Sequence, residues 1–186
     1  ITAVIQKNKF EITSLREDLN QSGRYTDIIY TNDWSKDARR RDFTFNAMYM
    51  SPFGKITDYF FGKNDIHLQT VRFIGDIEER IQEDYLRILR FFRFLGIFEK
   101  PKIINGYESV LNQYFKEVFH YLSNDLLRIE ILKMFNNSFP VNSFTSHKNK
   151  KEKNNWVKLT TQHFQDTQYD LGLNKCLNKI DILFKK

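Results

Sequence analysis

Apolar residues recur at helical spacing within residues 75–94, at positions 81, 85, 88, 89 and 92, and this pattern predicts one amphipathic helix. On such a helix Asp84 and Arg87 would be neighbours, a carboxylate beside a guanidinium group. Cytosine and adenine each offer an exocyclic amine next to a ring-nitrogen acceptor, which this pair complements, whereas uracil and guanine present the reverse polarity. From spacing alone, the more usual case is a solvated ion pair that contributes about 0.2 to 0.5 kcal/mol.

The residues before this helix predict a small amount of β structure. Alternation of apolar and polar positions predicts strands at residues 1–5 and 10–15, and a further strand at 55–60. A helix is expected to begin near Asp33 or Ser35, both plausible N-caps, and to run through residues 37–47.

The residues after it predict helices and then a polar tail. Segments 103–118 and 124–135 read as two further helices packed on the first. The basic run at 147–155 is typical of a solvated linker, although its lysines could also add nonspecific RNA affinity. The weakly amphipathic end, residues 170–186, favours at most a short helix.

Composition narrows the classes of protein. With 186 residues, 41% of them hydrophobic and 18 of them Phe, the chain can bury a Phe-rich core. The net charge of +6 favours a polyanionic partner such as nucleic acid. The single Cys176 excludes an intrachain disulfide and a cysteine-based zinc site. No apolar run approaches the roughly 20 residues of a membrane span, so we expect a cytoplasmic protein without a membrane partner.

Four segments together resemble one known family. Residues 83–87 resemble the EDxxR motif of the class II tRNA nucleotidyltransferases (CCA-adding enzymes) and their bacterial poly(A) polymerase relatives, and residues 71–76 and 88–94 resemble its flanks. Residues 37–47 resemble the family's RRDFTINA motif. Residues 122–130 resemble LSxERIxxE, except that Leu126 replaces the Arg. The resemblance covers about residues 1–135.

The resemblance implies roles for particular side chains. Asp84 and Arg87 would template incoming CTP and ATP, with Glu83 bracing them, and Glu11 would be the third catalytic carboxylate. On a straight helix each step of three residues drifts by about 60°, so Arg93 would lie nearly opposite Asp84. The residues implied to bind nucleotide are Arg16, Arg41, Asp42, Asp84, Arg87, Arg90 and Arg93.

Each of these roles has a simpler alternative. Arg40 and Arg41 could merely pair with Asp37 and Asp42, and Glu11 could simply face solvent. Arg93 could be a surface charge or an ion-pair partner that orients other residues.

The family's metal-binding motif does not occur in this sequence. The resemblance implies Mg²⁺, which the family holds with an early Asp-x-Asp after a glycine-rich GG motif, and the chain contains neither motif. Because Mg²⁺ needs several oxygen ligands, Glu11 alone is not a site, and no complete metal site is expected. The chain starts with Ile1 inside an apparent strand, so we expect that upstream sequence or a separate chain completes the head domain.

These observations predict an α+β fold: part of a polymerase β-like nucleotidyltransferase head, with a few-stranded sheet and a helix, followed by an all-α neck. The predicted domains are a partial head at 1–72, a helical neck with the template helix at 73–138, and a basic polar tail at 139–186.

Three functions fit this reading. The first is a tRNA nucleotidyltransferase that adds CCA to a tRNA or other RNA 3′ end from CTP and ATP, incomplete as this chain. The second is a poly(A) polymerase relative that uses ATP only. The third is an inactive RNA-binding relic or subunit.

Overall fold

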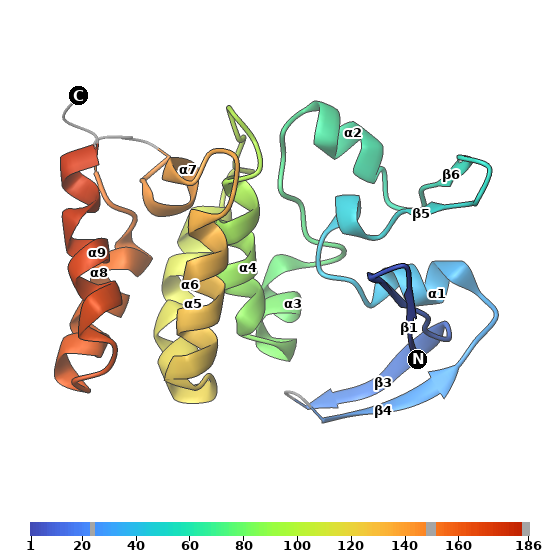
Figure 1. Cartoon of the computed structure of the whole chain (residues 1–186), viewed down its shortest axis with the longest axis horizontal. Helices are drawn as coiled ribbons and strands as arrows, with labels where there is room; N and C mark the ends of the chain where they lie inside the picture. The colour runs from blue at the N-terminus through green and yellow to red at the C-terminus, as the bar shows by residue number, and fades with distance from the viewer. Residues whose placement is uncertain (23–24, 148–151, 184–186) are drawn as a thin grey trace.

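The computed structural model describes residues 1–22, 25–147 and 152–183, and its elements form a strand-containing part and a helical part (Figure 1). In the first part the described strands pair as three separate antiparallel hairpins, β1 with β2, β3 with β4, and β5 with β6. Its elements are β1 (Thr2–Ile5), β2 (Asn8–Glu11), β3 (Arg16–Ser22), β4 (Tyr25–Tyr30), α1 (Trp34–Arg39), the 3₁₀ turn η1 (Thr44–Asn46), β5 (Tyr49–Met50), β6 (Ile56–Thr57) and α2 (Gly62–His67).

The second part is all helical, and its helices lie together on one side of the molecule in Figure 1. They are α3 (Ile77–Glu83), α4 (Leu86–Leu95), α5 (Tyr107–Tyr121), α6 (Asn124–Phe135), α7 (Val141–Phe144), α8 (Asn155–Asp166) and α9 (Leu171–Leu183). None of the helices in the described ranges has the length and apolar character that a membrane crossing requires. The predicted α+β fold, small sheets followed by helices, is confirmed.

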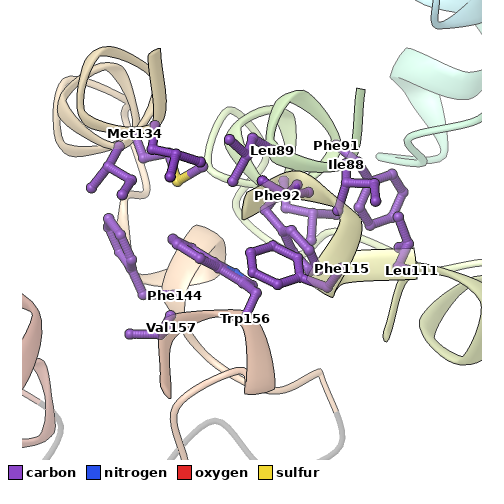
Figure 2. Close-up of a cluster of buried hydrophobic side chains, with 14 of the residues drawn as sticks. Ile88, Leu89, Phe91, Phe92, Leu111, Phe115, Met134, Phe144, Trp156 and Val157 are labelled. Carbon is purple, nitrogen blue, oxygen red and sulfur yellow. The ribbon is translucent and has the colours of Figure 1, made fainter. Parts of the chain in front are cut away.

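Helix α4 lies at the centre of the hydrophobic core. Its side chains Ile88, Leu89 and Phe91 are fully buried, and Figure 2 shows them among residues from α5, α6, α7 and α8. Phe43, from the segment between α1 and η1, is also fully buried, and its ring centroid lies 5.3 Å from that of Phe94. The core therefore reaches from the helical part into the strand-containing part.

The predicted continuous helix at 75–94 is wrong, because the structure has two helices there. Helix α3 ends at Glu83, Asp84 is extended with φ −156° and ψ 107°, and α4 begins at Leu86. The Asp84 carboxylate accepts a hydrogen bond from the Leu86 amide at 3.0 Å. Such a bond to the nearby backbone competes with helix continuation, so Asp84 and Arg87 are not neighbours on one straight helix.

The predicted helix through residues 37–47 also ends earlier. Its N-cap is Asp33, as expected, but α1 stops at Arg39. Phe43 is extended, at φ −122° and ψ 150°, and its amide donates to the Asp42 carboxylate at 3.1 Å. The extended backbone places the Phe43 ring in the core. Burial of this ring stabilises the fold more than another helical turn would.

The remaining elements differ mostly at their ends. The predicted helix at 124–135 coincides with α6, while the one at 103–118 is observed as α5, a few residues later. The strand predicted at 10–15 divides into the end of β2 and the residues that lead to β3.

The polar tail is more ordered than the sequence predicted. Helices α8 and α9 occupy much of it, and Trp156 is fully buried, with its Nε1 donating to the Ser143 carbonyl at 3.1 Å. The Trp156 ring lies 5.6 Å from Phe92 and 5.7 Å from Phe144, centroid to centroid. The sequence did not predict α8, and it favoured at most a short helix where α9 lies, because the apolar residues there stand among many Lys and Asn residues. Residues 148–151 of the basic run lie outside the described residues.

We expect Trp156→Ala to lower the free energy of unfolding by about 3 to 5 kcal/mol, because it removes a large side chain from the core. Trp34→Ala is the matched control, since Trp34 is half exposed, and it should cost less than about 1 kcal/mol. Denaturant unfolding of both variants measures this. Equal costs would show that α8 does not pack on the core as described.

Candidate functional site

A cluster of charged side chains joins the two parts of the molecule, and Glu83 is at its centre. The Glu83 Oε2 accepts hydrogen bonds from Nη1 of Arg80 and from Nη1 of Arg87. Arg87 is 6% exposed and also donates to the Arg80 carbonyl at 2.8 Å. One carboxylate at the end of α3 thereby fixes two guanidinium groups.

Arg80 extends this cluster into the strand-containing part. Its Nη2 donates to the carbonyl oxygens of Arg40 at 3.0 Å and of Arg41 at 2.8 Å. Burial, followed by the nearby Arg87 charge, lowers the pKa of Arg80, and Glu83 opposes that shift. Arg80 therefore holds the chain after α1 against α3.

Asp84 lies at the edge of this cluster and is partly buried. One of its carboxylate oxygens accepts from the Leu86 amide, and within the described ranges Oδ2 takes part in no hydrogen bond. Among the same residues, Arg87 uses only its Nη1. One acceptor on Asp84 and the other nitrogens of Arg87 are thus left for a further partner.

Asp42 and Arg90 form a second link between the two parts. The Arg90 Nε lies 2.6 Å from the Asp42 Oδ2, and Asp42 is nearly fully buried while the Arg90 side chain is 35% exposed. The other Asp42 oxygen accepts from the Phe43 amide. The structure therefore brings Arg90 next to the segment that follows α1.

Arg93 points to a different neighbour. Its Nε lies 2.9 Å from the Glu130 Oε2 of α6, and its guanidinium carbon lies 4.4 Å from the Phe94 ring centroid. Glu130 also pairs with Lys133 at 2.6 Å. Arg93 is thus held against α6 by an ion pair, which is one of the two alternatives that the sequence left open for it. It is not part of the cluster around Glu83.

Asp37 has a central role in this region that the sequence did not predict beyond a possible ion pair with the arginines. It is buried and accepts from Arg40 Nε at 3.0 Å and Nη2 at 2.8 Å, from Arg41 Nη2 at 3.2 Å, and from the Tyr49 hydroxyl at 2.7 Å. The Arg16 amide donates to it at 3.1 Å. Only its spacing before the arginines could have pointed to this role.

These contacts determine the charge state of Asp37. Burial alone would raise the pKa of Asp37, but the hydrogen bonds from Tyr49, the Arg16 amide and Arg40 outweigh burial and hold that pKa well below its usual range. Burial first, and then Asp37, raise the pKa of the Tyr49 hydroxyl. Asp37 is therefore ionised and Tyr49 neutral at physiological pH.

The predicted residues of the strand region lie further from this cluster. The Arg16 Nε pairs with the Asp18 Oδ1 at 3.1 Å. Glu11 is exposed at the end of β2, where it pairs with Thr2 across the hairpin. Within the described ranges no group of three or more His, Cys, Asp or Glu residues could hold a metal ion. Glu11 therefore stands alone, and these residues do not form a magnesium site.

This chain is similar in sequence to known proteins. Residues 1–72 match the family described as the poly A polymerase head domain. The human mitochondrial CCA tRNA nucleotidyltransferase 1 is 51% identical over 102 residues, 54% of this chain and 24% of that protein. The CCA-adding enzyme of Oceanobacillus iheyensis is 35% identical over 135 residues, 68% of this chain and 32% of that protein.

A solved structure is similar as well. The Bacillus stearothermophilus CCA-adding enzyme in complex with CTP has 26% identity and a TM-score of 0.66, over 77% of this chain and 34% of that one. The class that this similarity defines is that of proteins with a poly A polymerase head domain, which residues 1–72 match. Within that class, the chain is a relative of the CCA-adding enzymes and poly(A) polymerases. It spans about a quarter to a third of the length of the curated relatives that it matches.

We expect Asp37→Asn to lower the free energy of unfolding by about 1 to 3 kcal/mol at pH 7, because it weakens several buried hydrogen bonds. The folded pKa of Asp37 is depressed, so its contribution is present above the unfolded pKa of about 3.9 and is lost as the pH falls below that value.

Denaturant unfolding between about pH 7 and pH 2 tests this, and the gap between wild type and the variant should close in acid. Glu79→Gln is the control, because Glu79 is exposed on α3, and its curve should run parallel to that of the wild type. A gap for Asp37→Asn that stays constant with pH would contradict the expectation.

Proposed function

We propose that this chain is the head-and-neck portion of a tRNA nucleotidyltransferase that adds CCA to tRNA 3′ ends from CTP and ATP. The observation that carries the proposal is the fixed edge formed by Asp84 and Arg87 beside Glu83. The names of the human and bacterial relatives support it. The proposed domains are residues 1–72 for the partial head, 73–138 for the neck and 139–186 for the segment after it.

The proposed selection of the base follows from the free polar atoms at this edge. The open oxygen of Asp84 accepts from the exocyclic amine of cytosine or adenine, and Arg87 donates from Nε or Nη2 to the ring nitrogen. Glu83 holds Arg87 by its Nη1, which fixes the direction of the guanidinium before the nucleotide arrives. Uracil and guanine are rejected because their donor and acceptor are exchanged at these positions.

The proposed triphosphate contacts come from arginines that are partly exposed. The side chains of Arg16, Arg41 and Arg90 are 42%, 40% and 35% exposed, so each can share its guanidinium between its aspartate and a phosphate oxygen. Asp42 orients Arg90, and Arg93, which Glu130 of α6 holds in place, supports the site from α4. The net charge of +6 favours the approach of a triphosphate and of RNA.

The metal and its ligands are a separate part of the proposal. Nucleotidyltransferases generally use a divalent metal, and we propose Mg²⁺. The described residues do not fit a Mg²⁺ site, because Glu11 is a single exposed carboxylate. We propose that aspartates from another segment or a separate chain complete the site, with Glu11 as the third carboxylate.

Two other functions are each supported by one observation. The match of residues 1–72 to the poly A polymerase head domain favours a relative that uses ATP only, and comparing CTP with ATP incorporation distinguishes it. The lack of an Asp-x-Asp in this sequence favours an inactive RNA-binding relic, which activity on mixing with a head fragment would exclude. The cytoplasm stays our prediction for the compartment, although the human relative is named mitochondrial.

We expect Asp84→Ala and Arg87→Ala each to lower discrimination of CTP and ATP against UTP and GTP by about 1 to 3 kcal/mol, because each removes one half of the base contact. Competition among the four nucleotides during 3′ extension, with a head fragment supplied, measures this. Arg128→Ala, an exposed arginine on α6, is the control. Unchanged preference in both template variants would reject the assignment.

We expect the chain alone, with Mg²⁺, to extend a tRNA lacking its CCA end little or not at all, since its described residues provide no metal site. Adding a head fragment that contains the Asp-x-Asp should restore extension. Efficient extension by the chain alone would show that the proposed division of the site is wrong.

A further inference from the structure

Phe61 has an unusual backbone conformation and an exposed ring. Its φ of 61° and ψ of 29° lie in the left-handed region, which glycine and asparagine adopt far more readily than an aromatic residue. Its side chain is 76% exposed, so the ring contributes little to the core. Packing therefore does not explain a phenylalanine at this position.

The neighbouring residues fix the loop that carries Phe61. The Asp58 carboxylate accepts from the amides of Phe60 at 3.2 Å, Gly62 at 2.9 Å and Lys63 at 2.9 Å. Gly62 packs so closely that an added Cβ would lie 2.3 Å from the Thr44 carbonyl oxygen. The ring is thus presented from a rigid support, and little conformational entropy is lost when it binds a partner.

A cavity of about 420 Å³ lies beside the ring, lined by Asp58, Phe61, Lys63, Asn64 and His67. The Lys63 ammonium takes part in no ion pair among the described residues, while the Asp58 carboxylate is occupied by three backbone amides. A flat aromatic surface, an amide and a free cation are the groups that bind a stacked base, its edge and its phosphate.

We propose that Phe61, Lys63, Asn64 and His67 bind one unpaired nucleotide of the RNA substrate, with the base stacked on Phe61 and its phosphate near Lys63. This inference rests on the proposed function for its RNA partner. The site lies at the start of α2, which is separate from α3 in Figure 1, so it holds a part of the RNA distinct from the incoming nucleotide.

The charge of the region favours RNA over an apolar protein partner. The acid within α2, Asp65, is buried and accepts from Arg72 Nε at 3.0 Å and from the Thr44 hydroxyl at 2.7 Å. Among the described residues that line the cavity, the one carboxylate is that of Asp58, which is partly buried and accepts from three backbone amides. The net charge of +6 for the whole chain acts in the same direction.

The test measures RNA binding and thermal stability on the whole chain. The probe is a fluorescently labelled single-stranded RNA of about ten nucleotides, followed by anisotropy. We expect Phe61→Asn to weaken binding about tenfold and to raise the Tm by about 2 to 4 °C, because asparagine tolerates the left-handed backbone. A purely structural phenylalanine would instead lower the Tm when replaced.

Three further variants serve as controls. Phe61→Trp keeps a ring and should bind within about twofold of the wild type. Phe53→Asn removes an aromatic side chain that is 97% exposed but does not line the cavity, and it should leave binding unchanged. Lys63→Ala should reduce the slope of log K against log salt by about 0.7, the value for one phosphate contact with a single strand.

Several results would overturn the proposal. They are unchanged RNA affinity in Phe61→Asn, an equal loss in Phe53→Asn, or an altered oligomeric state with RNA binding intact, which would assign the ring to a protein contact. If the wild type binds no RNA, both this site and the proposed RNA partner fail. If the wild type binds RNA and Phe61→Asn binds equally well, only this site fails and the proposed function stands.

Discussion

The Glu83 carboxylate, shared between Arg80 and Arg87, is the interaction on which the rest of the arrangement depends. Burying a guanidinium group without a partner costs several kcal/mol, roughly 3 to 5 when one member of a buried pair is removed. Both arginines are at least nine-tenths buried, so the Glu83 carboxylate is the partner that offsets their burial. Its place at the end of α3 also determines where Arg87 points and where Asp84 leaves the helix.

The same cluster explains how the strand-containing part and the helical part are held together. Arg80 reaches the carbonyl oxygens of Arg40 and Arg41, and the Phe43 ring enters the core a few residues later. Polar contacts specify the position of the segment, while aromatic burial supplies most of the stabilisation. Two of the proposed phosphate contacts belong to this link: Arg41, whose carbonyl oxygen Arg80 contacts, and Arg90, which pairs with Asp42.

The sequence predicted those parts of the fold that depend on periodicity. The apolar spacing of α6 and the N-cap of α1 at Asp33 were recovered, and the motifs indicated the family. The two helices that were predicted too long end where a single side chain binds nearby backbone. Asp84 accepts from the Leu86 amide and interrupts the helix predicted at 75–94. Asp42 accepts from the Phe43 amide in the extended segment that follows α1. The burial of Trp156 follows from tertiary packing within a polar segment, which composition does not reveal.

A double-mutant cycle between Arg80→Met and Glu83→Gln, measured by denaturant unfolding of the chain, tests the central role of this carboxylate most directly. Our account predicts that the two changes are strongly coupled, with an interaction free energy of about 1 to 3 kcal/mol. Additive effects, within about 0.5 kcal/mol, would contradict it and would show that Glu83 does not hold Arg80, the residue that reaches the strand-containing part.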